Sequence, residues 1–278
     1  MRRAVLAGGC LLVAASGQAG HHLFNPTPAD RLREMNTDRP DKTESPCTVD
    51  AGHFQFESDL VSYTCDRDSS GGGDTRTEAW SFATINLKAG LLEDLDLQVV
   101  IEPHNRVRSE DRAAGMVTRQ SGFGDLTVRV KKNFWGNGGG RTAFAVMPFV
   151  KIPTSRGGLG NNAVEGGIIL PLAVELPGGW GMGLMTEADW LQDDSGSGRH
   201  ASFVNSITFS HDIVGALAGY AEFFSEVSAE SGSRWVGTVD LGLTYGLTKN
   251  IRLDAGINIG VTDSADDLNP FIGVSWRF

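Results

Sequence analysis

The feature of this sequence that most constrains its fold is a set of long segments in which apolar and polar residues alternate. In residues 251–262 a face rich in isoleucine opposes a face of polar residues and glycines, and residues 95–108, 126–131 and 235–247 repeat the pattern. Successive side chains of a β-strand point to opposite faces, so each segment predicts a strand with one apolar face. Strands of roughly 10 to 13 residues exceed the usual 5–6 and match strands that cross a membrane.

Short turns and longer polar connections alternate along the chain without exception. The turns are 93–94, 135–140, 176–180, 210–215 and 249–250, and the longer stretches are 66–76, 109–120, 154–163, 193–200, 228–233 and 263–269. Outer-membrane barrels have this asymmetry, with short turns on the periplasmic side and long loops outside. We therefore expect an all-β, transmembrane, antiparallel up-and-down β-barrel of about 12 strands, to within about two, with both termini periplasmic.

The chain ends in the alternating segment FIGVSWRF. Ile272, Val274, Trp276 and Phe278 share one face of this segment. A sheet edge is not tolerated in hydrocarbon, so we expect this strand to pair with the one that begins near His53 and close the barrel. Trp276 and Phe278 would then lie in the periplasmic aromatic girdle. A terminal strand that ends in phenylalanine also resembles the signal read by the barrel assembly machinery, which the resemblance implies as a partner.

The N-terminus predicts export. Two arginines precede an apolar run over 4–15 and then small residues, the form of a signal peptide cleaved after Ala19. The run is shorter than the ~20 residues that a membrane-spanning helix needs. We therefore expect a signal peptide at 1–19, a periplasmic segment at 20–52 and a barrel at 53–278, located in the outer membrane with its lipid as a partner. Residues 28–52 are polar and lack alternation, and two alternatives stay open for them: a periplasmic tail, or a plug inside the lumen.

Charge and cysteines add two constraints. The net charge is −10, and −12 without Arg2 and Arg3 of the leader, which argues against a nucleic-acid partner. Cys47 and Cys65 would face an oxidising compartment. They lie at opposite ends of one extended segment, far beyond the ~7 Å that a disulfide allows between Cα atoms. We predict that they do not pair.

The polar faces of the predicted strands point into the lumen and carry opposite charges on different walls. The predicted pore-lining residues are basic on one side, His104, Arg106, Arg108, Arg129, Lys131 and Lys151, and acidic on the other, Glu165, Glu187, Asp189, Glu222 and Glu226. Opposed charges would produce a transverse field that orients dipolar solutes. Alternatively, these residues pair across a narrow lumen and hold it shut.

Catalysis and metal binding find little support. His211 lies between Ser210 and Asp212 in a predicted turn, and His104 is predicted to line the lumen, so neither forms a convincing nucleophile site. The histidines show no metal-ligand spacing, and the glycine-rich stretches precede no helix that would bind phosphate. We predict no enzyme, no cofactor and no metal, with an outer-membrane hydrolase as the third-ranked reading.

Several stretches together resemble one known family. They are TDRPDKTESPCTVDAGHFQFE (37–57), GDLTVRVKKNFWGN (124–137), MPFVKIPT (147–154), VEGGIILPLAVELPGGWGMGLMTE (164–187) and FVNSITFSHDIVG (203–215). The chain is similar here to the outer-membrane transporters named for the meta-pathway of phenol degradation, although Cys47 replaces an expected aromatic residue. The resemblance implies a channel for passive uptake of small solutes, aromatic or otherwise hydrophobic. The alternative is a non-conducting barrel with a structural or surface-interaction role.

Overall fold

The structure is a computed structural model that describes residues 20–69, 73–156 and 158–278. The predicted signal peptide lies outside the described residues. None of the described residues belongs to a helix that could span a membrane. The strands are β1 (Phe54–Asp68), β2 (Thr75–Leu92), β3 (Leu95–Ile101), β4 (His104–Asp111), β5 (Met116–Gly122), β6 (Leu126–Trp135), β7 (Thr142–Ile152), β8 (Glu165–Leu176), β9 (Trp180–Gln192), β10 (Arg199–Val214), β11 (Leu217–Ser228), β12 (Val236–Thr248), β13 (Ile251–Gly260) and β14 (Leu268–Arg277).

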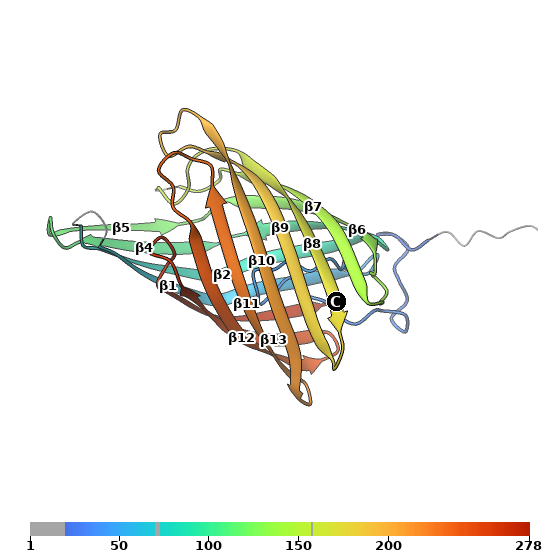
Figure 1. Cartoon of the computed structure of the whole chain (residues 1–278). Coiled ribbons are helices and arrows are strands. Elements are labelled where there is room, and N and C mark those ends of the chain that lie inside the picture. Colours follow the sequence, from blue (N-terminus) through green and yellow to red (C-terminus); the bar gives the residue numbers. More distant parts are fainter. Residues whose placement is uncertain (1–19, 70–72, 157) are drawn as a thin grey trace, which may run out of the picture.

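These strands form one antiparallel sheet that closes on itself, because β1 pairs with both β14 and β2 (Figure 1). Two positions in the ring are each filled by two consecutive strands. In the first of these positions, β3 and β4 pair with successive parts of β2. In the second, β6 pairs with β3, and β5 pairs with β4. The described strands thus occupy twelve positions of a closed barrel, which confirms the predicted architecture and strand number.

The last strand is held by the first, as the sequence predicted. Phe54 and Phe278 exchange backbone hydrogen bonds of 3.0 and 2.9 Å, and their rings stack with centroids 6.0 Å apart. The side chains of Ile272, Trp276 and Phe278 are exposed on the outer face, and Val274 on the same face is half-buried. The part that this face plays in assembly remains a prediction.

Aromatic side chains form two belts on the outer surface. The belt at the short-turn end includes Phe54, Trp135, Trp180, Tyr245, Trp276 and Phe278, and the belt at the long-loop end includes Trp80, Phe82, Trp190, Phe203 and Trp235. Trp190 lies ten positions after Trp180, and Tyr245 lies ten positions after Trp235. At ~3.3 Å per residue and a tilt near 40°, this spacing is about 25 Å, the height of an apolar band that spans a membrane.

On β1, β2 and the β3–β4 pair, the alternation of inward and outward side chains reverses at one height of the barrel. Near the short turns, Lys88 of β2 and Gln98 of β3 face each other in the lumen, whereas farther along the same strands Phe82 and His104 face each other on the outside. The change occurs at Ala83, which has a φ of 55°, and at the gap between β3 and β4. Proline at position 103 has no N–H for the ladder, which explains the gap.

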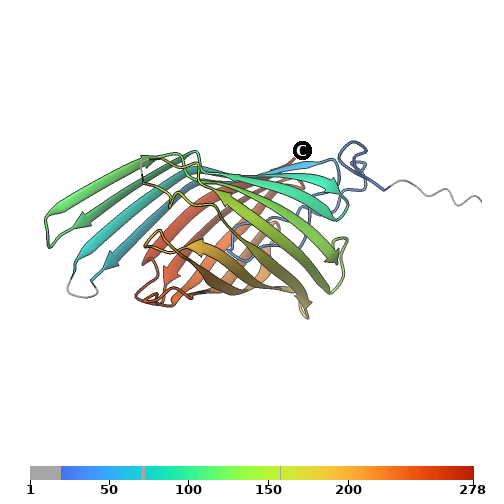
Figure 2. The same ribbon diagram turned by 90° about the horizontal axis from the view of Figure 1, so that it is seen from above.

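Beyond this height the barrel is uneven. β4 and β5 form a hairpin that extends past most other strands (Figures 1 and 2), and β5 pairs with β4 alone. Cys47 and Cys65 are both free thiols, which confirms the prediction that they do not pair. Cys65 lies on the extended part of β1, and Cys47 lies in the segment that precedes the barrel.

Candidate functional site

Residues 33–50, which we call the lumen segment, lie inside the barrel (Figure 1). The segment has no regular secondary structure, but most of its residues are buried or half-buried. Its polar groups contact inward-facing side chains around the ring. These wall partners are Glu57, Asp59, Lys88, Asp96, Arg129, Lys131, Met185, Ser206, Glu222, Thr238, Asp240 and Asp254.

The two ends of the lumen segment meet at the end of β14. Asp50 binds the guanidinium groups of Arg33 and Arg277 at 2.6 and 3.1 Å, and Arg277 also donates to the carbonyl of Arg33 at 2.8 Å. Arg33 donates in addition to the carbonyl of Thr48 at 3.0 Å. The segment is therefore a closed loop whose base is fixed to the strand that completes the barrel.

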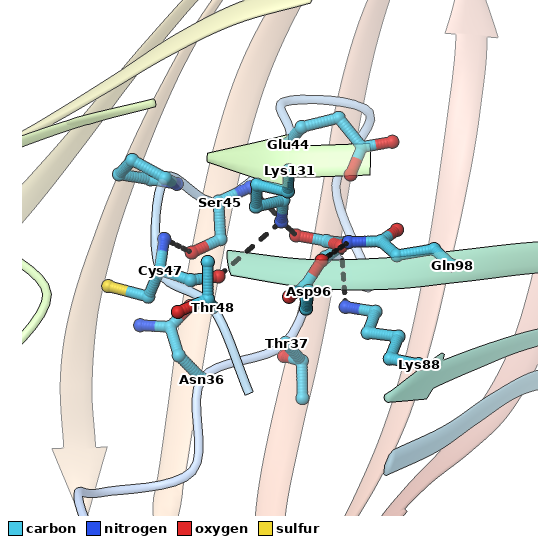
Figure 3. A network of polar contacts seen from close by, with 12 residues as sticks. Asn36, Thr37, Glu44, Ser45, Cys47, Thr48, Lys88, Asp96, Gln98 and Lys131 are labelled. Atoms are coloured by element: carbon cyan, nitrogen blue, oxygen red, sulfur yellow. Dashed lines mark hydrogen bonds and ion pairs between the residues drawn. The ribbon is translucent and has the colours of Figure 1, made fainter. Parts of the chain in front are cut away.

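Asp38 is the centre of the first group of contacts, which includes Lys88 and Lys131. Figure 3 shows these two lysines beside the lumen segment. The carboxylate of Asp38 lies 2.5 Å from the ammonium groups of both Lys88 and Lys131 and accepts the backbone N–H of Ser45 at 3.1 Å. Burial alone would raise the pKa of Asp38, but Lys131 and Lys88 hold that pKa well below its usual range. Asp38 thus joins the start and end of the loop 38–45 and binds it to β2 and β6.

Neighbouring carboxylates complete this group. Glu57 lies 2.5 Å from Lys88 and accepts the backbone N–H of Asp38 at 3.1 Å. Asp96 of β3 is fully buried and accepts the backbone N–H of Val49 at 3.1 Å. Three carboxylates therefore surround two buried ammonium groups, and their attraction reduces the large cost of removing such charges from water.

A second group of contacts fixes the loop to β1, β11 and β13. The Arg39 guanidinium binds Asp59 of β1 and Asp254 of β13, each at 2.6 Å. The backbone N–H groups of Lys42 and Thr43 donate to the two oxygens of Glu222 on β11 at 2.9 and 2.8 Å. Charge-assisted hydrogen bonds of this kind are about twice as strong as neutral ones, so the loop is held from both sides.

Further contacts of the same loop reach β6, β10 and β12. Thr43 shares a 2.6 Å hydrogen bond with Ser206, and Lys42 lies 3.2 Å from Asp240 and above the ring of Phe224. Glu44 binds Arg129 at 2.6 Å. The loop is thus linked to side chains on most sides of the lumen.

Two acids of the loop titrate at unusually high pH. Burial, together with the nearby charge of Glu222, raises the pKa of Asp41 to about 8. Burial and the charge of Asp38 raise the pKa of Glu44 to about 6, against the opposing effect of Arg129. Both groups hold protons more tightly in this position than they would in water.

The lumen segment separates two cavities. One has a volume of about 260 Å³ and is lined by the loop 38–44 and by polar side chains toward the long-loop end, including Asn258 and Asn269. The other has a volume of about 480 Å³ and opens among the short turns, lined by Leu32, Met35 and Lys249. The segment therefore lies across the route that would join the two ends of the barrel.

Part of the inner wall is apolar. Met147, Ile169, Met185 and Val204 form a buried cluster on β7 to β10, with Phe149 and Phe224 packed beside it. The backbone N–H of Glu44 donates to the Met185 sulfur at 3.4 Å, so the lumen segment covers one edge of the cluster. The lumen consequently has an apolar patch within a wall that is otherwise polar and charged.

The structure brings most of the predicted pore-lining residues to the lumen, but in contact with partners. Arg129, Lys131 and Glu222 bind the lumen segment, Lys151 and Glu165 bind each other at 2.5 Å, and Glu226 accepts a bond from Ser202 at 2.9 Å. Glu187 and Asp189 lie opposite inward residues of β8 and β10. These predicted pore-lining residues therefore do not form two opposed walls of unpaired charges.

His104, Arg106 and Arg108 do not line the lumen. They lie directly opposite Phe82, Trp80 and Glu78 of β2, on the face that carries the exposed aromatic belt. The prediction for these three residues is wrong because it extends the alternation of β3 across the gap that follows this strand. Inward and outward positions exchange at that gap. In this part of β4 the inward residues are Asn105, Val107 and Ser109.

Sequence reasoning missed the residues of the lumen segment itself. Asp38, Arg39, Asp41, Lys42 and Glu44 were left without a role, although five charged residues of both signs within 37–45 gave a signal. A short stretch with that density of mixed charge is suited to bind a wall that carries charges of both signs.

The other residues considered for chemistry have ordinary contacts. The ring nitrogens of His211 hydrogen-bond to the carbonyls of Asp212 and Gly178, not to the hydroxyl of Ser210. Near the long loops, side-chain ligand atoms of Asp193, His200 and Glu230 lie within 4.8 Å of one another, a group that the sequence spacing did not reveal. His200 is bonded to Asp193 there at 2.9 Å.

Comparisons with solved structures agree with this fold. The COG4313 outer membrane channel from Pseudomonas putida F1 is 13% identical with a TM-score of 0.65, covering 87% of this chain and 100% of its own. The translocator domain of the autotransporter NalP from Neisseria meningitidis is 12% identical with a TM-score of 0.54, covering 81% and 88%. The NanC porin is 11% identical with a TM-score of 0.52, covering 81% and 100%.

The search of curated proteins finds no match to this chain. A sequence profile, in contrast, matches residues 37–278, which include most of the lumen segment and the whole barrel. The profile describes the family that the sequence resembles. The chain therefore belongs to the family described as "Putative MetA-pathway of phenol degradation".

Proposed function

We propose that this protein is an outer-membrane channel for passive uptake of small solutes, and that the lumen segment is its gate. The observation that carries the proposal is the position of this segment between two cavities, bound to both walls by charged side chains. Solutes would pass when the loop 38–45 leaves its wall partners. The channel named among the similar structures supports the same reading.

The contacts of the loop suit a gate better than a permanent core. Most are ion pairs or hydrogen bonds, and water can replace such contacts when the loop leaves, whereas an apolar core would expose its surface at large cost. The base of the loop is fixed separately by Arg33, Asp50 and Arg277. The loop could therefore swing out while its ends stay attached.

The proposed solutes are small amphipathic molecules such as hydroxylated aromatics. The cavity of about 260 Å³ offers amide and hydroxyl groups beside the ring of Phe271. The buried cluster around Met185 would offer an apolar surface once the lumen segment leaves it. The family description, which names phenol degradation, agrees with this class. Catalysis is not part of the proposal, because the similar structures named above are channels, porins and translocators.

A disulfide lock tests the gate. Thr43→Cys and Ser206→Cys, in a Cys47→Ser and Cys65→Ser background, would join the loop to β10, where the two hydroxyls are 2.6 Å apart. We expect no single-channel current in planar bilayers and no uptake of 4-hydroxybenzenesulfonate, a phenolic whose fixed charge prevents it from crossing the bilayer unaided, into liposomes while the lock is oxidised. Reduction should restore both signals, because it releases the loop.

A wall-only lock gives the control. Ser202→Cys and Ser228→Cys join directly paired positions of β10 and β11 without touching the lumen segment. This barrel should behave alike before and after reduction. Equal uptake by the oxidised and reduced Thr43–Ser206 lock would overturn the gate. A folded, reduced barrel that passes neither ions nor 4-hydroxybenzenesulfonate would instead support the non-conducting alternative.

A further inference from the structure

Five arginines gather on the outer face of the extended strands β1, β2, β4 and β5. This outer arginine patch consists of Arg67, Arg76, Arg106, Arg108 and Arg119. The register places all five on one face, because Arg67 is opposite Arg76, Arg106 is opposite Trp80 of the aromatic belt, and Arg108 is opposite both Glu78 and Arg119. The patch is notable in a chain whose net charge is −10.

Two of the cross-strand pairs within the patch are unfavourable in isolation. Arg67 faces Arg76, and Arg108 faces Arg119. Like charges directly opposite each other destabilise a sheet. Only Glu78 and Glu110 supply carboxylates on the strands of this face: Glu78 pairs with Arg76 at 2.9 Å and with Arg108 at 3.2 Å, and Glu110 pairs with Arg108 at 2.8 Å.

The remaining cations are less well compensated. Arg67 binds Asp74 in the adjoining connection at 3.1 Å. Arg106 and Arg119 are exposed, and no carboxylate among the described residues forms an ion pair with either. The outer face therefore has more arginines than carboxylates, with two guanidinium groups free to bind an anion.

The height of the patch indicates which anion it meets. The rings of Tyr63, Trp80, Phe82 and His104 form a continuous row, with neighbouring centroids 4.5, 6.1 and 6.0 Å apart. Such aromatic rows mark the boundary between hydrocarbon and headgroups. The patch begins at this row and extends about 13 Å along β2 to Arg76, at ~3.3 Å per residue. It thus lies at the level of lipid headgroups.

We infer that the outer arginine patch binds the phosphates of a phosphorylated glycolipid of the outer leaflet, of the lipid A type. Planar guanidinium groups bind phosphate through paired hydrogen bonds, and a headgroup with two phosphates can be shared between neighbouring arginines. The acyl chains would lie along the aromatic row and the apolar strands below it. The phosphates would relieve the repulsion between Arg108 and Arg119.

Binding of purified lipid A to the folded mature chain in detergent tests the inference, read by native mass spectrometry. The double variant Arg106→Gln and Arg119→Gln removes the two guanidinium groups without ion-pair partners. We expect about a tenfold weaker binding of diphosphorylated lipid A, since charge-assisted hydrogen bonds to phosphate are lost. The control is Arg199→Gln and Arg234→Gln, two exposed arginines elsewhere at the long-loop end, which should change binding less than about twofold.

Three results would overturn the inference. The control pair could weaken binding as much as the patch pair, which would indicate a general charge effect. Lipid A from which the phosphates have been removed could bind equally well, which would leave only the acyl chains. Millimolar inorganic phosphate could displace the lipid completely, which would make the site one for free phosphate. A heat-dependent shift in gel mobility confirms that each variant is a folded barrel.

Discussion

The lumen segment and the outer arginine patch are both built from ion pairs between basic and acidic side chains, but the first is buried and the second is exposed to solvent. Inside, Lys131 is fully buried and lies 2.5 Å from Asp38. Outside, Arg108 lies 2.8 Å from Glu110, but both side chains are about one third exposed. The nitrogen–oxygen distances of the two ion pairs are similar, whereas their exposure to water differs.

This difference determines what each group of charges can do. A buried charge without its partner is costly, so the inner contacts act together and define one position for the loop. An exposed pair contributes little to stability because water and salt screen it, and its arginines stay available for a ligand. The inner network is therefore suited to a gate with two positions, and the outer patch to binding.

The largest effect should come from Lys131→Met, which leaves Asp38 with only Lys88 as a cation. Removing one partner of a buried ion pair costs about 3–5 kcal/mol. We expect the loop 38–45 to leave the wall, which would give sustained current in planar bilayers and protease cleavage within residues 33–50. A silent, protease-resistant barrel would show that the buried pair does not hold the gate.

The adjacent lysine provides the matched control. Lys132 also pairs with an aspartate at 2.5 Å, but its side chain is 41% exposed and its partner Asp94 is 46% exposed. Lys132→Met should therefore change the stability by less than about 1 kcal/mol and leave the current unchanged. An effect as large as that of Lys131→Met would remove the distinction between inner and outer charges.

Much of the fold could be predicted from the sequence because it depends on local patterns. Alternation in 251–262 and the pairing of the terminal strand rest on strand periodicity and on the need to close the sheet. The faces of β4 could not be predicted in the same way. At the strained residue Ala83 and at the proline at position 103, inward and outward positions exchange. A period of two residues cannot predict the faces of a strand beyond such a point.

The lumen segment could be recognised only in part. Its charge density is visible in the sequence, but its partners Lys88, Glu222 and Asp254 are separated from the residues they bind by 50 to 215 positions. The pairing of charges over such distances depends on which strands face the loop, and that follows from the closed barrel and its register. The sequence alone therefore left the tail and the plug as open alternatives.

Arg39→Lys should have the next largest effect. The guanidinium joins Asp59 and Asp254 through separate nitrogens, and a single ammonium group cannot reproduce that geometry. Loss of one charge-assisted hydrogen bond costs about 1.5–3 kcal/mol. We expect brief openings in single-channel records, fewer than for Lys131→Met. If β1 and β13 held the loop more strongly than β2 and β6 do, Arg39→Lys would instead cause more openings than Lys131→Met.

Acidity should modulate the gate more weakly. The pKa values of Asp41 and Glu44 are raised, to about 8 and about 6, so their contribution to docking is complete below about 4 and is lost as pH rises through those values. Asp38, with its lowered pKa, contributes above its ordinary value and loses that contribution only in stronger acid. The open fraction should therefore increase from about pH 4 to about pH 8 in single-channel records.

Asp41→Asn separates this effect from a general effect of pH on the barrel. The amide cannot ionise, so the increase in open fraction above pH 7 should largely disappear, while Lys132→Met should keep it. If Asp41→Asn had the same pH dependence as the wild type, then the carboxyl groups of the loop would not control docking.

The smallest effect on stability should come from Glu110→Gln in the outer patch. The pair with Arg108 is solvent-exposed, so the urea midpoint of unfolding should stay within error of the wild type. The same change removes one of the two carboxylates that compete with phosphate for these arginines. Binding of diphosphorylated lipid A should therefore strengthen, by about twofold. A lower midpoint with unchanged lipid binding would show that the outer charges, like the inner ones, serve to hold the barrel together.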